Sequence, residues 1–182
     1  MYDPKKHHRR SIRLPHYDYS QAGYYFVTIC CHQRECLFGE IVDGAMQLNQ
    51  YGKTVAESYQ WLAQRYPYLV LDEWIVMPNH FHAIMVLTNP PRRGSSRTAL
   101  TSDIAPTVKR KSLGRLIGAF KTVSTKQINI IRNTSGSKAW QRNYYEHIIR
   151  NEKALNNIRQ YIINNPLSWQ KDQLHPDNPS KW

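Results

Sequence analysis

Apolar residues follow two different spacings along the chain, one typical of strands and the other of helices. Residues 24–30 are aromatic or β-branched apart from a final cysteine, which predicts a central strand. Residues 68–76 and 81–87 have a similar character and flank the turn residues Pro78 and Asn79. We therefore expect these two segments to pair as an antiparallel hairpin.

Three segments carry apolar residues three or four positions apart, as amphipathic helices do. Each follows a residue that is suited to helix capping, and two of the three end at a proline. The predicted helices follow Asn49, Ser112 and Asn151, and they end at Pro67, near residue 131 and at Pro166. A turn at 42–44 leads into a short strand, and the aromatic segment 140–149 is expected to be extended.

The predicted order of elements is strand, strand, helix, strand, strand, helix, strand, helix. Strands joined by hairpins, with helices packed against one face, favour an α+β fold with a mostly antiparallel sheet. The ferredoxin-like arrangement suits this order better than a doubly wound parallel sheet. The chain has no internal repeat and no glycine-rich phosphate loop.

The length of 182 residues suits one folded domain, which we place at residues 17–169. A basic N-terminal arm, residues 1–16, precedes it, and a C-terminal tail, residues 170–182, follows it. Residues 89–111 are rich in Pro, Ser, Thr and Arg, which predicts a flexible polar connection inside the domain.

The chain has 25 Lys and Arg residues against 13 Asp and Glu residues, a formal charge of +12. This surplus favours a polyanionic partner, while 41% hydrophobic residues exclude disorder throughout. No segment resembles a membrane span or a secretory signal, so we expect a cytoplasmic protein with no membrane partner. Because Cys30, Cys31 and Cys36 lack a Cys-x-x-Cys pair, we expect buried strand thiols rather than disulfides or a zinc site.

His80 and His82 are the first candidates for chemistry. Strand residues two apart share a face, so both imidazoles point the same way while Phe81 points into the core. Two such imidazoles can converge on one metal ion. The alternative from the pair alone is one histidine hydrogen-bonded at a sheet edge and the other exposed.

Tyr161 and Asn165 form a second pair, separated by one turn of the last predicted helix. They share a face beside the apolar stripe of that helix. Taken singly, Tyr161 could equally be a packing tyrosine, and Asn165 a simple helix stop before Pro166.

The joint pattern resembles the single-tyrosine HUH transposases, specifically the REP-associated tyrosine transposases of bacteria. Five segments carry the resemblance in order, and they extend over most of the chain. They are Pro78-Asn-His-Phe-His82, Gly118-Ala-Phe-Lys121, Trp140-Gln-Arg-Asn-Tyr-Tyr-Glu-His147, Ile149-Arg150-Asn151, and Tyr161-Ile with Asn165-Pro166.

The resemblance implies a ferredoxin-like HUH endonuclease fold and a metal-dependent enzyme that cuts and joins single-stranded DNA beside REP-type hairpins. Tyr161 is the implied nucleophile, forming a 5′-phosphotyrosine intermediate, and His80, His82 and Asn165 are the implied ligands of Mg²⁺ or Mn²⁺. The expected partner is single-stranded or hairpin DNA in the bacterial nucleoid. Both a monomer and a homodimer remain open.

Other residues in these segments are candidates for supporting roles. Glu146 and His147 are expected near the metal, where they would orient a water molecule or contact the outer shell. The DNA-binding candidates are basic residues for phosphate contacts and aromatic residues for base stacking. They are Arg10, Arg13, Lys121, Trp140, Arg142, Tyr144 and Arg150.

Two other functions are compatible with parts of this pattern. A domesticated, catalytically silent relative would use the basic surface to hold structured DNA or RNA without cutting it. A metal-dependent hydrolase of a small substrate would use the histidines alone, and the charge of +12 disfavours this reading.

Overall fold

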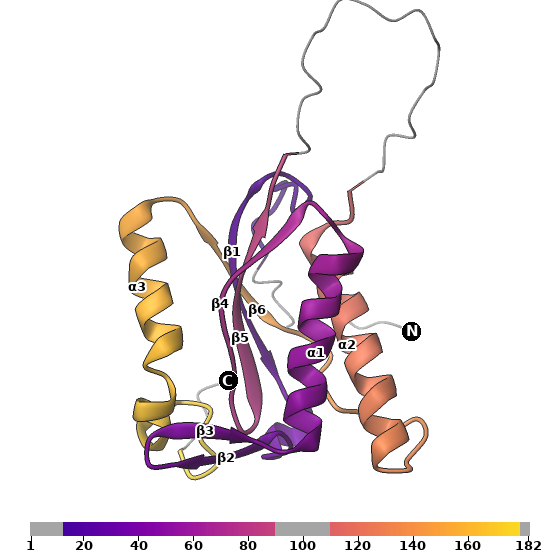
Figure 1. The fold of residues 1–182 in the computed structure, drawn as a ribbon. Helices are drawn as coiled ribbons and strands as arrows, with labels where there is room; N and C mark the ends of the chain where they lie inside the picture. The colour runs from indigo at the N-terminus through magenta and orange to yellow at the C-terminus, as the bar shows by residue number, and fades with distance from the viewer. Residues whose placement is uncertain (1–12, 90–109, 179–182) are drawn as a thin grey trace, which may run out of the picture.

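The computed structural model describes residues 13–89 and 110–178 (Figure 1). The predicted arm is described only from Arg13 onward, and most of the predicted polar connection lies outside the described residues. The elements are β1 (Gly23–Cys30), η1 (His32–Arg34), β2 (Gly39–Val42), β3 (Ala45–Leu48), α1 (Gln50–Arg65), β4 (Leu69–Val76), β5 (His80–Leu87), α2 (Leu113–Ile131), β6 (Tyr145–Ile149), α3 (Glu152–Ile163) and η2 (Pro166–Lys171), where η marks a 3₁₀ helix.

The main sheet has four strands in the order β4-β5-β1-β6, and each neighbouring pair is antiparallel. The expected hairpin is present, since β4 pairs with β5 and Val76 faces Phe81 across the turn. Strands β5 and β1 are central, and every residue of β5 is buried. The α+β fold with a mostly antiparallel sheet is thereby confirmed.

The helices cover both faces of the sheet, so the expectation of helices on one face was wrong (Figure 1). Helices α1 and α2 pack on the face that carries Val27 and Phe81. Helix α3 packs on the opposite face, where Leu155 and Ile162 contact a cluster that includes Ile84. A central strand buried on both sides requires this arrangement, because one layer of helices would leave half of its apolar side chains in water.

Helix ends agree closely with the capping residues. Asn49 accepts hydrogen bonds from the backbone N–H groups of Tyr51 and Gly52, and Asn151 accepts one from Ala154. Ser112 occupies the N-cap position of α2 but makes no capping hydrogen bond through its side chain. The first N–H of that helix instead donates to the carbonyl of Tyr19.

A separate β2–β3 hairpin lies below the main sheet in Figure 1. Its turn at Asp43 and Gly44 has positive φ angles of 51° and 75°, which Asp-Gly sequences adopt readily. The expected short strand is β3, whereas β2 was not predicted.

The three cysteines lie in different environments. Cys31 is buried but Cys36 is exposed and outside any strand, so the expectation of three buried strand thiols was wrong.

The described part of the chain contains no helix that is both long enough and apolar enough to span a membrane. The longest described helix, α2, has 19 residues and carries three basic side chains.

Candidate active site

Strand β5 holds His80 and His82 side by side on the face covered by α3. In the register with β1, His80 faces Cys30 and His82 faces Thr28, while Phe81 enters the core on the other face. Both imidazoles are buried, and their ring centroids are 4.5 Å apart. The sheet therefore brings the two histidines together, as the alternation along the strand predicts.

The hydrogen bonds of Asn79 determine which nitrogen of His80 carries a proton. The amide nitrogen of Asn79 donates to the carbonyls of Arg34 and Leu174, so its oxygen, Oδ1, faces Nδ1 of His80 at 2.8 Å. Because Oδ1 can only accept, Nδ1 must donate, and Nε2 keeps a bare lone pair. This Nε2 is buried and has no hydrogen-bond partner among the described residues.

His82 is held from both sides. Its Nδ1 lies 2.8 Å from the hydroxyl of Thr28, and its Nε2 lies 3.3 Å from the hydroxyl of Tyr161. Burial lowers the pKa of His80 to about 3, and burial together with the neighbouring His80 lowers the pKa of His82 well below its usual value. Both imidazoles are consequently neutral at pH 7, the form that binds a metal ion.

Tyr161 lies on α3 with its hydroxyl turned toward the histidines. The residue is 47% exposed, and the centroid of its ring lies 5.2 Å from that of His82 and 6.1 Å from that of Phe26. Burial of the hydroxyl, with a further effect from Asp172, raises the pKa of the phenol to about 12. Tyr161 is therefore open to a large substrate on one side but is a weak nucleophile without further activation.

Asn165 and Asp172 complete the cluster from the C-terminal side of α3. The Oδ1 of Asn165 is buried without a hydrogen-bond partner among the described residues, and its amide nitrogen donates to Asp172 at 3.3 Å. The side chain of Asn165 approaches the imidazole of His80, where it favours the protonated form. Two buried acceptors, Asn165 Oδ1 and His80 Nε2, thus meet with no donor between them.

Asp172 is the residue that sequence reasoning missed. It follows η2, in the segment that we expected to be a tail, and its carboxylate lies with His80 and His82 in a cluster whose ligand atoms are all within 4.8 Å of one another. A single acidic residue after the last helix has no spacing that distinguishes it from any other surface carboxylate. Only the folding of η2 back onto the histidines reveals it.

The donor set of this cluster suits a divalent cation. Two neutral imidazoles and a carboxylate could hold a metal ion, and the unpartnered Oδ1 of Asn165 is a further acceptor beside them. Ligand atoms about 2.1 Å from one ion lie at most about 4.2 Å apart, so separations of up to 4.8 Å need a contraction of at least about 0.6 Å. The unpartnered lone pairs and this spacing both fit a cation.

Residues of η2 and of the segment that follows it close the site. Trp169 lies over His80 with ring centroids 6.0 Å apart, and His175 packs against Trp169 at 4.7 Å. The carbonyl of Leu174 accepts a hydrogen bond from Asn79. Trp169 thus contacts the histidine strand, and Leu174 contacts the supporting amide of Asn79.

The candidates for supporting roles near the metal lie elsewhere. Glu146 pairs with Val27 across the sheet, so it points to the face opposite His80 and His82, and its expected place beside the metal was wrong. There it forms an ion pair with Arg13 at 3.7 Å. His147 pairs with Phe26 on the same face as the histidines, but its side chain is exposed.

The DNA-binding candidates lie in different environments. Trp140 is only 6% exposed, packs on Phe38 and Phe120, and donates its indole N–H to Ser124, so it belongs to the core rather than to a stacking surface. Tyr144 is half-buried under Arg13, which donates to its hydroxyl. Lys121 is half-buried and donates to two backbone carbonyls, Arg142 and Arg150 are exposed, and Arg10 lies outside the described residues.

Comparison with known proteins agrees with the resemblance inferred from the motifs. A Haemophilus influenzae protein named "Uncharacterized protein" is 38% identical over 192 residues, covering 97% of this chain and 98% of that protein. A second protein of that organism, named "Putative REP-associated tyrosine transposase", is 26% identical over 150 residues, covering 82% of this chain and 73% of that protein. No family model matches the chain.

A solved structure has the same fold. It is a REP-associated tyrosine transposase bound to a REP hairpin, with a TM-score of 0.56, 17% sequence identity and coverage of 96% of this chain and 91% of that one. The chain therefore belongs to one family with its full-length Haemophilus influenzae relative, and the resemblance of this family to the REP-associated tyrosine transposases is confirmed.

Proposed function

We propose that this protein is a metal-dependent transposase-like enzyme that nicks and joins single-stranded DNA, with Tyr161 as the nucleophile. The observation that carries the proposal is the 3.3 Å approach of the Tyr161 hydroxyl to His82, beside buried ligand atoms without partners. A packing tyrosine would turn its hydroxyl to solvent or to a permanent partner. Here the hydroxyl faces the only His-His-Asp cluster in residues 13–89 and 110–178.

In the proposed reaction, a phosphoryl group of the DNA is transferred from a 3′-oxygen to the protein. The oxygen of Tyr161 forms a bond to the scissile phosphorus while the bond to the 3′-oxygen breaks, and the departing 3′-oxygen takes up a proton to become a hydroxyl. The phenolic proton passes to water, because the imidazole of His82, which lies 3.3 Å from this hydroxyl, would be committed to the cation. A phenolate is a comparatively good leaving group, so attack by a 3′-hydroxyl can reverse the step and join the strands.

His80, His82 and Asp172, with Asn165 beside them, would hold the divalent cation. The cation supplies charge neutralisation at the phosphate oxygens. Mixed nitrogen and oxygen ligands suit Mg²⁺ or Mn²⁺, and imidazole favours Mn²⁺ of the two. A phenol whose pKa is raised to about 12 needs such electrostatic help to react at neutral pH.

The proposed substrate is single-stranded DNA next to a hairpin. The similar transposase structure contains a REP hairpin, and the charge of +12 suits a nucleic acid. The direct test incubates purified protein with labelled hairpins that carry single-stranded extensions, with Mn²⁺ or with EDTA. We expect a covalent protein–DNA adduct on a denaturing gel with Mn²⁺ only. Binding without any cut on every substrate would instead support the silent binding module.

Changing Asp172 to Asn should weaken Mn²⁺ binding by at least about tenfold, since a ligand or its close partner is lost. Titration of Mn²⁺ followed by calorimetry measures this directly. Asp177→Asn is the matched control, because this aspartate lies in the same segment with a side chain that is 90% exposed. If Asp172→Asn kept full Mn²⁺ affinity and Asn165→Ala lost it, the carboxylate of Asp172 would have no role in binding, and Asn165 would be the ligand instead.

An ion pair fixes the rotation of the tyrosine helix. The guanidinium of Arg159, two residues before Tyr161, donates to both oxygens of Asp72 at 2.8 and 2.5 Å. Asp72 lies where the register of β4 with β5 shifts between Leu71 and Trp74, and a bulge of this kind re-aims side chains. The pair therefore joins α3 to the sheet beside the histidines.

Changing Asp72 to Asn should slow adduct formation several-fold at saturating DNA, because Tyr161 is then held less firmly at His82. The free energy of unfolding should fall by less than about 1 kcal/mol, as for other partly exposed ion pairs. Mn²⁺ affinity should not change. Glu73→Gln removes the neighbouring exposed charge and serves as the control. An equal decrease in the rate of adduct formation in both variants would show that the loss of negative charge, and not the loss of the Arg159–Asp72 pair, causes the effect.

A further inference from the structure

The two histidines are oriented by partners of different kinds. His80 faces the amide oxygen of Asn79, which can only accept a hydrogen bond. His82 has the hydroxyl of Thr28, on the neighbouring strand β1, 2.8 Å from its Nδ1, and the hydroxyl of Tyr161 3.3 Å from its Nε2. A hydroxyl can donate or accept. The contacts of His82 alone therefore allow both of its tautomers, unlike those of His80.

The two tautomers of His82 differ in what Nε2 offers. With the proton on Nδ1, the ring donates to Thr28, and Nε2 keeps a lone pair. With the proton on Nε2, that nitrogen cannot bind a cation. The cluster also contains two buried acceptors without partners among the described residues, His80 Nε2 and Asn165 Oδ1. These acceptors fit a cation, so the tautomer with the proton on Nδ1 is the one that completes the cluster.

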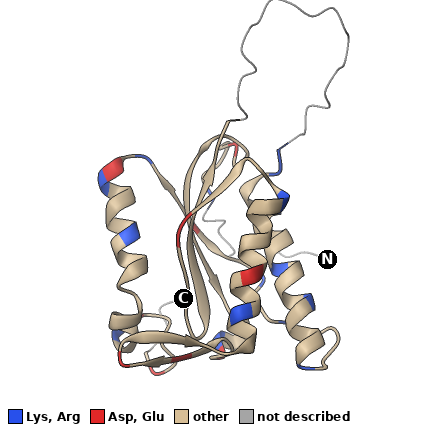
Figure 2. Ribbon diagram, viewed as in Figure 1, with Lys and Arg blue, Asp and Glu red and all other residues tan. Residues whose placement is uncertain are grey.

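The surroundings of His82 leave its orientation to Thr28. Strands β1 and β5 contain no Asp, Glu, Lys or Arg, so neither strand supplies an ionised side chain to orient the ring (Figure 2). Thr28 and His82 are direct partners in the register of β1 with β5, and both are buried. A buried N–H group without an acceptor is strongly disfavoured. The oxygen of Thr28 therefore stabilises the tautomer whose Nε2 is bare.

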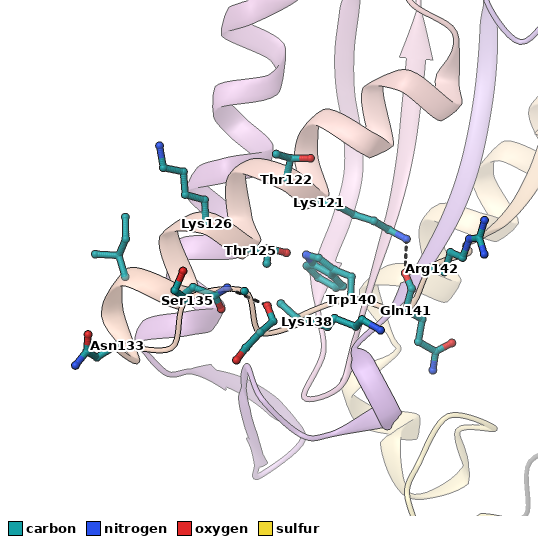
Figure 3. A pocket seen from close by; sticks show the side chains of 15 residues that line it. Lys121, Thr122, Thr125, Lys126, Asn133, Ser135, Lys138, Trp140, Gln141 and Arg142 are labelled. Carbon is teal, nitrogen blue, oxygen red and sulfur yellow. Dashed lines mark hydrogen bonds between the residues drawn. The ribbon is translucent and has the colours of Figure 1, made fainter.

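The backbone of β1 holds Thr28 in a fixed place. This strand pairs with β5 on one side and with β6 on the other. At its end, the carbonyl of Cys30 accepts a hydrogen bond from the N–H of Gln141, and Lys121 of α2 donates to the carbonyl of Gln141 (Figure 3). A β-branched side chain such as that of Thr28 has few rotamers. The hydroxyl is thus preorganised for His82.

We propose that Thr28 is a positioning residue of the candidate site: its oxygen accepts a hydrogen bond from Nδ1 of His82 and so keeps the Nε2 lone pair free for the cation. This inference rests on the proposed function, because that function assigns His82 to the cation. Asn79 acts in the same way on His80. Two imidazoles with a bare Nε2 are then present before the cation binds, and this raises the affinity for it.

The test replaces the oxygen of Thr28 and little else. Thr28→Val keeps the branched shape and removes the hydroxyl, whereas Thr28→Ser keeps a hydroxyl at this position. Thr54→Val is the matched control, because Thr54 is similarly buried but lies in α1, where its hydroxyl donates to the carbonyl of Gln50. Nitrogen-15 NMR of the metal-free protein shows which ring nitrogen of His82 carries the proton. Calorimetry measures Mn²⁺ affinity.

In the wild-type protein and in Thr54→Val, we expect the proton of His82 on Nδ1. In Thr28→Val the proton should move to Nε2, and Mn²⁺ affinity should fall by about tenfold. Thr28→Ser should keep the wild-type tautomer, with an Mn²⁺ affinity within about threefold of the wild-type value.

Three results would overturn the inference. They are a wild-type protein with the proton on Nε2, an unchanged tautomer and affinity in Thr28→Val, and an equal loss of affinity in Thr28→Ser and Thr28→Val, which would assign Thr28 to packing. The first of these needs no variant, so the inference is tested even where a variant fails to fold. A wild-type protein that has the expected tautomer and binds Mn²⁺, but forms no adduct with DNA, would support the inference and refute the proposed function.

Discussion

Tyr161→Phe should abolish the covalent protein–DNA adduct while leaving hairpin affinity within about twofold of the wild-type value. The variant removes one oxygen, the atom that lies 3.3 Å from His82, and leaves a ring that still packs against Phe26. In the proposed reaction the phosphotyrosine bond is made to this oxygen, so the loss should be complete. Denaturing gels measure the adduct, and filter binding measures the affinity.

Tyr145→Phe is the matched control for this experiment. Tyr145 is 46% exposed against 47% for Tyr161, and its ring lies 6.3 Å from the same Phe26. It lies on β6 across from Thr28, on the same face of the sheet as the histidines. The control should form the adduct at the wild-type rate. An undiminished adduct in Tyr161→Phe would assign the nucleophile to another residue.

His80→Ala should abolish both metal binding and strand cleavage. Nε2 of His80 is the buried lone pair without a partner, and its removal leaves the cluster one imidazole short. In the wild-type protein, Mn²⁺ at 100 times its dissociation constant should stabilise the fold by about 2.7 kcal/mol. This corresponds to a rise in Tm of about 5–10 °C. The variant should show no rise.

Two further variants keep this prediction testable. The side chain of His80 is fully buried, so the alanine variant could fail to fold, and His80→Gln, which retains a polar side chain, addresses that case. His32→Ala, in η1, removes a histidine outside the cluster and should retain the full metal-dependent rise in Tm. A metal-dependent rise of equal size in His80→Gln would contradict the assignment of this nitrogen as a ligand.

The metal-free protein also has a defined pH dependence. Burial lowers the folded-state pKa of His80 to about 3, below its ordinary value of 6.5. The unfolded chain therefore binds more protons between these values, and the contribution of His80 to stability is present above pH 6.5 and is lost as the pH falls. Metal binding at pH 7 meets little competition from protons at this nitrogen for the same reason.

Local sequence patterns predicted most of the elements. The capping residues Asn49 and Asn151 and the alternation of β5 lead to boundaries that agree with the structure within one or two residues. Strand β2 was not predicted, because it has only four residues and begins at Gly39, whose φ is 138°. Its stability comes from pairing with β3, which a local pattern does not reveal.

Some features of the candidate site could also be predicted from the sequence, and others could not. His80 and His82 share a face because side chains alternate along any strand, so their proximity follows from the sequence alone. The approach of Tyr161 to His82 joins residues that are 79 positions apart, and only the resemblance to a known family suggested it beforehand. Two residues show what the sequence could not predict. Asp172 joins the cluster only because the C-terminal segment folds back onto the histidines, and Glu146 points away from them because of the register of β6 with β1.

By itself, the sequence determined the elements, the basic charge, the histidine pair and the relationship to tyrosine transposases, because each is encoded in neighbouring residues or in ordered motifs. The tertiary structure alone decided which face α3 covers, that Trp140 is core, and that Asp172 joins the cluster. These features depend on contacts between distant segments. Such contacts are selected by the burial of the whole apolar surface, and no single segment specifies them.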